Sequence, residues 1–161
     1  MKDLIVYYSL EGNTEYVANR IKAITGADIL KLVPRKAYSS RGFLKFLRGG
    51  KSAIAEECPK LEEYDVELSS YDRIILGFPV WASRVTPPLR TFIEDNREML
   101  KGKHFVTFAC QSGSGAEKAF VKLAECIGID GFDNTAIFID PKSKKSVETD
   151  NMIDAFANEL L

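Results

Sequence analysis

The clearest chemistry in the sequence lies in residues 9–14 (SLEGNT), here called the first loop. It separates an apolar run that ends at Tyr8 from a segment of helical spacing that contains Val17. Hydroxyls, unhindered backbone N–H groups and the positive end of a helix dipole together suit a bound phosphate. The loop lacks the lysine of a nucleoside-triphosphate loop and the three glycines of a dinucleotide loop, which favours a phosphate monoester. The alternative is that Asn13 or Ser9 only caps the helix.

A second loop, residues 77–88 (GFPVWASRVTPP), contains the only tryptophan of the chain. It follows an apolar strand-like run, and its end resembles a helix start, because Pro88 suits a first helical turn and Thr86 suits the capping position. A loop is a poor place for a core residue, so we expect Trp81 to cover a flat aromatic ligand. The alternative is a tryptophan folded onto its own domain.

A third loop, residues 110–115 (CQSGSG), precedes a helical segment that starts near Ala116. Its glycines allow a close approach of the backbone to a ligand, and Gln111 and the serines can donate and accept hydrogen bonds. The alternative is a flexible turn. Cys110 is as well explained by packing at the end of a strand as by contact with a ligand.

The three loops are positioned by the elements on either side of them. Five short apolar runs predict strands, and segments of helical spacing lie between them. The predicted strands are Leu4–Tyr8, Ile29–Val33, Arg73–Phe78, Phe105–Cys110 and Thr135–Ile139. The predicted helices carry apolar stripes at Val17, Ile21 and Ile24; at Leu89, Phe92 and Ile93; at Ala116, Phe120, Leu123 and Ile127; and at Met152, Phe156 and Leu160. Strands that alternate with helices predict a parallel sheet in a three-layer α/β/α sandwich. Ligands bind such sheets beyond the carboxyl ends of the strands, where the three loops converge.

One connection, from Pro34 to Tyr71, is longer than a simple crossover needs, and we expect a helix around Arg41–Ile54 within it. Between Ile29 and Ala55 the chain has seven basic residues and no acid, and an acidic stretch follows. Two solvated faces explain this pattern. The alternative is a docking surface for an anionic partner or substrate tail.

Length and composition set the remaining limits. The 161 residues are 45% hydrophobic with a formal net charge of -1, which predicts a single domain over residues 1–161 and no binding of nucleic acid. The apolar runs are too short to cross a membrane, and no export signal is visible, so we expect a cytoplasmic protein. Three cysteines without CxxC spacing indicate reduced thiols and no metal site. The single histidine, His104, opens a strand at the amino end of the sheet, away from the loops.

The two longer motifs resemble the flavodoxin family. The first loop is similar to its phosphate loop, and Gly77-x-Pro79-x-Trp81 with Thr86-Pro87-Pro88-Leu89-x-x-Phe92 is similar to the second flavin loop of its shorter bacterial and archaeal members. The resemblance covers nearly the whole chain and implies strand order 2-1-3-4-5 and a bound flavin mononucleotide (FMN). It implies that the phosphate is held by Ser9, Glu11, Gly12, Asn13 and Thr14. It further implies that Pro79, Val80, Trp81 and Ala82 line the isoalloxazine ring, and that Cys110, Gln111, Ser112 and Gly113 border its pyrimidine side.

Three hypotheses about activity follow. The favoured one is a diffusible carrier that exchanges electrons with a redox partner protein. The second is an FMN-dependent oxidoreductase that passes electrons from NAD(P)H or another donor to a quinone or similar small acceptor. The third is a binding module that keeps the fold without flavin. If Arg84 lies near the ring, its charge favours the anionic reduced flavin and raises the reduction potential.

Overall fold

Five parallel strands form the sheet of this computed structural model, which describes residues 1–38 and 50–161. Their order is β2-β1-β3-β4-β5, which confirms the expected topology. All five strands lie close to their predicted bounds: β1 Asp3–Tyr7, β2 Asp28–Lys31, β3 Arg73–Pro79, β4 His104–Gln111 and β5 Asn134–Ile139.

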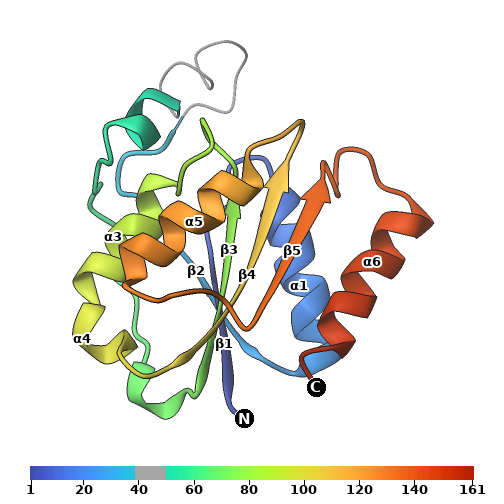
Figure 1. The fold of residues 1–161 in the computed structure, drawn as a ribbon, viewed down its shortest axis with the longest axis horizontal. Helices are drawn as coiled ribbons and strands as arrows, with labels where there is room; N and C mark the ends of the chain where they lie inside the picture. Colours follow the sequence, from blue (N-terminus) through green and yellow to red (C-terminus); the bar gives the residue numbers. More distant parts are fainter. Residues whose placement is uncertain (39–49) are drawn as a thin grey trace.

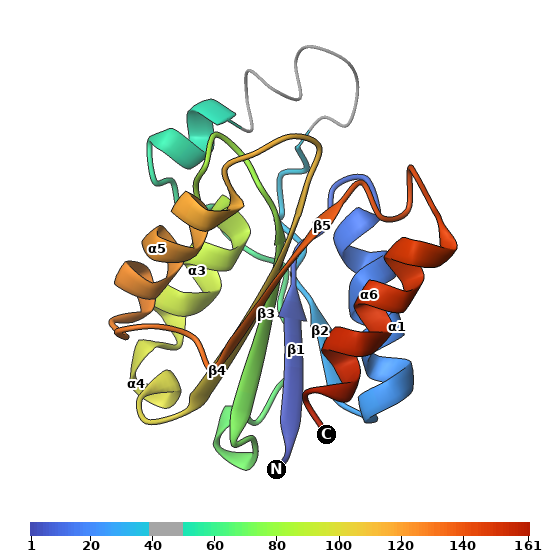
Figure 2. The ribbon, with the colours of Figure 1, turned by 45° about the vertical axis from the view of Figure 1, so that its right-hand side comes forward.

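Helices cover both faces of the sheet, so the expected three-layer sandwich is confirmed. Figure 2 shows the sheet edge-on, with α1 (Asn13–Thr25) and α6 (Val147–Asn158) on one side of it. On the other side lie α3 (Pro87–Asp95), α4 (Arg97–Leu100) and α5 (Ala116–Ile127). A short 3-10 helix, η1 (Leu68–Ser70), leads into β3. None of the described helices is long and apolar enough to cross a membrane.

The core is divided in two by the sheet. Because successive side chains of a strand point to opposite faces, Leu4 and Val6 pack on the side of α3 and α5, and Ile5 packs on the side of α1 and α6. Because helices cover both faces of the sheet, the strands are apolar on both faces. A glycine is needed at one position of β3, since a Cβ atom at Gly77 would overlap the ring of Phe108.

The predicted apolar stripe of the last helix is wrong by one residue. Met152 is 51% exposed, whereas Ile153, Phe156 and Leu160 are buried. The helix begins after Ser146, whose hydroxyl accepts a hydrogen bond from the backbone N–H of Thr149, and its packing against α1 selects the buried face. Steps of three and four residues from Ile153 reach Phe156, Ala157 and Leu160, which are all buried, so the stripe starts at Ile153 and only Met152 lies off it.

The long connection between β2 and β3 contains a helix at residues 50–54, at the end of the range predicted for it. The rest of that prediction, residues 41–49, lies outside the described residues. Beyond the helix the chain returns beside its own start: Pro34 and Leu61 form an isolated antiparallel bridge, and the Arg35 N–H donates to the carbonyl of Lys60 over 2.9 Å.

Candidate functional site

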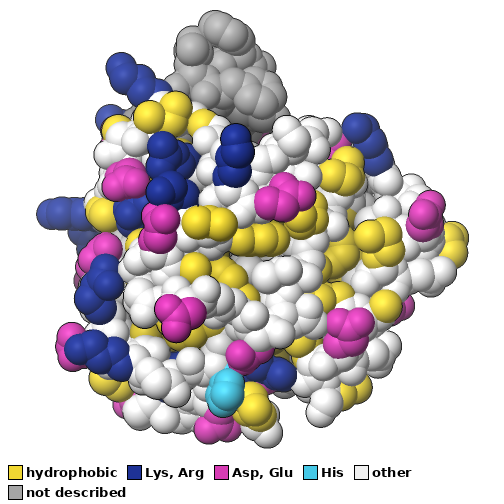
Figure 3. Space-filling model, viewed as in Figure 1, with side chains coloured by type: hydrophobic (Ala, Val, Ile, Leu, Met, Phe, Trp, Pro, Cys, Tyr) yellow, Lys and Arg dark blue, Asp and Glu magenta, His cyan; other side chains and the backbone are white. Residues whose placement is uncertain are grey.

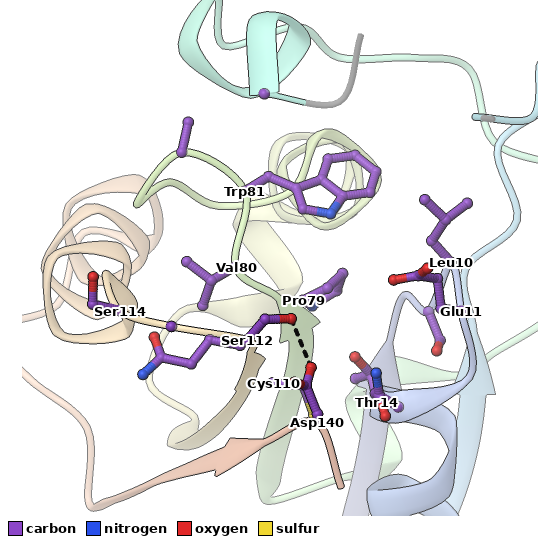
Figure 4. Close-up of a pocket in the computed structure, with 16 residues that line it drawn as sticks. Leu10, Glu11, Thr14, Pro79, Val80, Trp81, Cys110, Ser112, Ser114 and Asp140 are labelled. Carbon is purple, nitrogen blue, oxygen red and sulfur yellow. Dashed lines mark hydrogen bonds between the residues drawn. The ribbon is translucent and has the colours of Figure 1, made fainter. Parts of the chain in front are cut away.

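The strands β1, β3 and β4 end at the same edge of the sheet (Figure 1). A cleft of about 380 Å³ opens at this carboxyl edge (Figure 4). Its volume falls in the range of small-molecule sites. All of the predicted site residues line it except Gly12. The lining residues are Ser9, Leu10, Glu11, Asn13, Thr14, Gly50, Pro79, Val80, Trp81, Ala82, Cys110, Gln111, Ser112, Gly113, Ser114 and Asp140.

Gly12 shapes the first loop from behind. It occupies the N-cap position of α1 with φ at 91°, a conformation that favours glycine. Its N–H donates to the hydroxyl oxygen of Ser9 over 3.1 Å, and its carbonyl accepts from Tyr16 N–H over 3.0 Å. Gly12 is therefore not a lining residue, and its backbone N–H is already used within the loop.

The capping alternative for the first loop is wrong, because no side chain caps α1. The side-chain oxygen of Asn13 instead accepts hydrogen bonds from the backbone N–H groups of Lys142 and Ser143, over 2.9 and 3.1 Å. Asn13 thus ties the first loop to the segment that follows β5. The same segment places the Lys142 side chain against Gly12, where its Nζ would lie 2.6 Å from an added Cβ atom.

Thr14 brings a polar atom to the floor of the cleft. The residue is 1% exposed, and its hydroxyl has no hydrogen-bond partner of good geometry among the described residues. The thiol of Cys110 lies close to it. Burial raises the pKa of the Cys110 thiol to about 12, and the Thr14 hydroxyl opposes that rise in part. Cys110 is therefore a neutral thiol, and Thr14 is a buried hydroxyl that a ligand could satisfy.

Trp81 stands on the opposite side of the cleft from the floor, as Figure 4 shows. Its ring packs edge-on against Tyr8, with 5.6 Å between ring centroids, and against Tyr38 at 5.1 Å. The predicted alternatives for Trp81 are thus combined: the tryptophan packs on its own domain and also faces the cleft. Because two tyrosines hold the ring, its position does not depend on a ligand.

A tight turn orients Trp81. The N–H of Arg84 donates to the Trp81 carbonyl over 3.0 Å, and the two residues between them, Ala82 and Ser83, have φ values of 50° and 56°. Two successive positive φ values define a type I′ turn, which usually contains glycine or asparagine. Left-handed conformations of other residues cost free energy and are frequent at functional sites.

Arg84 does not line the cleft. Its guanidinium lies 3.9 Å from a carboxylate oxygen of Glu56, which Arg90 also approaches at 3.5 Å. The turn points the Arg84 side chain toward this acid, so the hypothesis that Arg84 stands beside a bound ring loses its geometric basis. The predicted helix start is confirmed in position: Thr86 is the N-cap of α3 and Pro87 opens it, although the Thr86 hydroxyl makes no capping hydrogen bond.

The third loop is tied down at both ends. The side-chain oxygen of Gln111 accepts the N–H of Ala116 over 2.9 Å, which leaves the amide N–H groups of Gln111 for a ligand. The hydroxyl of Ser112 donates to Asp140 over 2.6 Å, drawn as a dashed line in Figure 4. These contacts contradict the alternative of a freely flexible turn.

Four lining residues were missed from the sequence: Leu10, Gly50, Ser114 and Asp140. The sequence could have indicated Asp140 as a lining residue, because it directly follows β5 and the carboxyl ends of parallel strands meet at one edge of the sheet. The sequence analysis applied this rule only to the first, third and fourth strands. His104 lies at the amino end of β4, where it contacts Asp133 at 3.0 Å, so its predicted distance from the site is confirmed.

A family model described as Flavodoxin matches residues 2–149 of this chain. Among solved structures, a flavoprotein of Lactobacillus acidophilus in complex with FMN is 19% identical with a TM-score of 0.73, covering 84% of this chain and 92% of that one. A provisionally named flavoprotein of Bacteroides uniformis is 21% identical with a TM-score of 0.77, over 98% and 97% of the two chains. The two-electron reduced flavodoxin of Megasphaera elsdenii is 23% identical with a TM-score of 0.54, over 97% and 98%.

These three structures are similar in fold to the chain along most of its length, and the family model covers nearly all of it. The order of the strands, the phosphate-type loop before α1 and the tryptophan loop after β3 agree with that match. The chain belongs to the flavodoxin family.

Proposed function

We propose that the cleft binds FMN and that the protein transfers electrons. One observation carries this proposal: a single cleft joins a polar end at the start of α1 to a wall formed by Trp81. A molecule with a phosphate at one end and a flat ring system at the other matches that division. The Lactobacillus acidophilus flavoprotein, whose structure contains FMN, adds support from a protein of similar fold.

At the polar end, the residues present fit a phosphate. The Thr14 hydroxyl is buried without a partner of good geometry, and the Ser9 oxygen already accepts from Gly12 N–H, so its own hydrogen is left to donate. The first N–H groups of α1 have no partner within the helix and carry the positive end of its dipole. The loop also contains a carboxylate, Glu11, and the Lys142 ammonium beside Gly12 brings a positive charge to this end of the cleft.

At the ring end, Trp81, Pro79 and Val80 provide apolar surface on one side, and the third loop provides hydrogen-bonding groups on the other. The Val80 N–H donates to the Cys110 carbonyl over 2.9 Å, which holds these two walls at a fixed spacing. When bound, FMN would supply the capacity to accept and release electrons, and the protein would position it and adjust its potential.

We favour an electron carrier whose partner is another redox protein. A second function has one observation in its favour: Trp81 is the one aromatic among the described lining residues, and the side chain that faces it across the cleft is Leu10. If no second aromatic side chain covers the other face of the bound ring, that face has room for a small electron acceptor. An FMN-dependent oxidoreductase that uses NAD(P)H or another donor and a quinone is therefore the second candidate.

Absorption spectra, redox titration and reaction with NAD(P)H, all measured on the purified protein, distinguish these functions. We expect it to keep a flavin absorption band near 450 nm (an approximate property of flavins) after dialysis. A carrier takes up its two electrons in two resolved steps during a redox titration and reacts slowly with NAD(P)H. Rapid two-electron reduction by NAD(P)H, followed by quinone-dependent reoxidation, supports the oxidoreductase instead. A colourless protein that does not take up added FMN contradicts both and favours a binding module.

The cytoplasmic location and the proposed redox partner stay predictions. Cys58, Cys110 and Cys126 are all free thiols, which agrees with a reducing compartment. Fractionation of the producing cells tests the location, and copurification with a tagged form of the protein tests the partner.

A further inference from the structure

The segment after β5 brings a buried carboxylate, paired with an exposed lysine, to the wall of the cleft. Asp140 is 8% exposed and lines the cleft beside Ser112. One carboxylate oxygen accepts from the Ser112 hydroxyl over 2.6 Å, and the other lies 2.8 Å from the ammonium of Lys144. Bonds of this length to a charged acceptor are among the stronger hydrogen bonds in proteins.

The backbone fixes this carboxylate in place. The Asp140 N–H donates to the Gln111 carbonyl over 3.1 Å, and the Asp140 carbonyl accepts from Lys144 N–H over 2.7 Å. Its φ of 44° is left-handed, a conformation that aspartate and asparagine tolerate better than most residues. The position of the charge is therefore set by the fold and not by a ligand.

This arrangement determines what Ser112 can offer. A hydroxyl has one hydrogen and two acceptor lone pairs, and here the hydrogen is given to Asp140. Ser112 also lines the cleft, so toward a ligand it presents an acceptor. A ligand group with an N–H bond fits there, and one that can only accept does not.

We propose that Asp140 is a positioning residue that holds Ser112 as a hydrogen-bond acceptor toward the ring of the bound ligand. Together with the opposite charge of Lys144, the Asp140 carboxylate also sets the reduction potential of that ligand. This inference rests on the proposed function. A carboxylate at the wall opposes the arrival of electrons, and the lysine ammonium 2.8 Å from it has the opposite effect. The two residues thus act on the potential with opposite signs.

The test uses the FMN-loaded protein and three variants. Asp140→Asn keeps the shape, the left-handed backbone preference and an oxygen for Ser112, but removes the negative charge. Lys144→Met removes the positive charge at a side chain that is 68% exposed, so folding is not at risk. We expect the first variant to raise the midpoint potential of bound FMN, the second to lower it, and the double variant to return it close to the wild-type value.

Two controls separate charge from general disturbance. Lys145→Met removes a neighbouring cation that lies over the Tyr16 ring, 5.3 Å from its centroid, and Glu148→Gln removes an exposed acid in the first turn of α6. Both are expected to leave the potential nearly unchanged. A purely structural role for Asp140 and Lys144 would weaken FMN binding in both variants without shifting the potential in opposite directions.

A further variant tests Ser112 itself. Ser112→Ala is expected to raise the dissociation constant of FMN about tenfold, the value of one hydrogen bond to a ligand. With wild-type protein that binds FMN, shifts of the same sign in Asp140→Asn and Lys144→Met, or no shifts, overturn this inference alone. Wild-type protein that binds no FMN overturns the proposed function and this inference together.

Discussion

The Thr14 hydroxyl is the residue-scale feature that most directly indicates a ligand. A buried hydroxyl without a hydrogen bond of good geometry costs about 1–3 kcal/mol, and a phosphate oxygen in the cleft would remove that cost. We expect Thr14→Val to raise the FMN dissociation constant by roughly 10- to 100-fold, since a hydrogen bond to a charged group contributes about 1.5–3 kcal/mol. Affinity for riboflavin, which lacks the phosphate, should stay the same. Fluorescence titration with both compounds measures these effects.

Thr86 offers a matched control for this experiment. Its hydroxyl is also buried and unpartnered among the described residues, but it lies outside the cleft. Thr86→Val and Thr14→Val should both stabilise the ligand-free protein, by about 1 kcal/mol, because each removes an unsatisfied buried group. If Thr86→Val weakened FMN binding as much as Thr14→Val, the phosphate assignment at Thr14 would be wrong.

At the scale of elements, the turn from Trp81 to Arg84 stores strain. Ala82 has a φ of 50°, which costs an L-residue about 1–2 kcal/mol, while glycine adopts it freely. We expect Ala82→Gly to raise the free energy of unfolding of the ligand-free protein by about 1 kcal/mol in urea denaturation. Ala155→Gly, at an exposed position of α6, should lower it by about the same amount. A loss of stability in Ala82→Gly contradicts the strained turn.

The contact between α1 and α6 predicts that the stability of the protein depends on pH in the acid range. The Arg20 guanidinium makes two hydrogen bonds to Asp154, at 2.6 and 2.8 Å, and these lower the pKa of the Asp154 carboxyl below its ordinary value of 3.8. The stabilisation is therefore present above that value and is lost as the pH falls through the lower pKa of the folded state. Asp154→Asn should be less stable than wild type near neutral pH, and the difference should vanish in strong acid.

Urea denaturation at a series of pH values measures that difference. Asp65→Asn, at an exposed carboxylate of the connection before β3, serves as the control. A gap between wild type and Asp154→Asn that stays constant with pH contradicts the role of this ion pair, as does a similar pH dependence in the control.

The strands and most helices were predictable because their signals are local. A buried parallel strand is a short apolar run, and α1, α3 and α5 carry one stripe of apolar residues each. The last helix was misread since Met152 and Ile153 both fit a helical spacing with Phe156, and only the packing against α1 selects Ile153. Residue identity cannot reveal that choice before the helices meet.

At the scale of the whole molecule, the distribution of surface charge does not indicate where a partner would bind. Figure 3 shows basic side chains gathered on the side where α3 and α5 lie, with acids between them. Pairs there include Arg97 with Glu94 and Lys122 with Glu125, both at 2.7 Å. Of the predicted basic segment, Lys31 pairs with Glu15 at 2.8 Å, and its residues between 39 and 49 lie outside the described part. The docking surface for an anionic partner stays a prediction.

The loops that form the site were predictable from the sequence, whereas the long-range contacts that hold those loops in place were not. Residues of the first, second and third loops follow strands that end at one edge, so the topology alone brings Ser9, Trp81 and Gln111 together. The contacts of Asn13 and Ser112 with the segment after β5 join residues more than 25 positions apart. No local pattern predicts such pairs, and for the same reason the ion pair of Arg84 with Glu56 was not foreseen.

The central claim is that this cleft binds FMN through its phosphate and its ring. Calorimetric titration of the flavin-free protein with FMN, and separately with riboflavin, tests it most directly. We expect one site per chain for FMN, with riboflavin bound at least about 100-fold more weakly, because the contacts at the start of α1 need the phosphate. Absence of heat with FMN under conditions where the protein is folded, or equal affinity for the two compounds, would contradict the account.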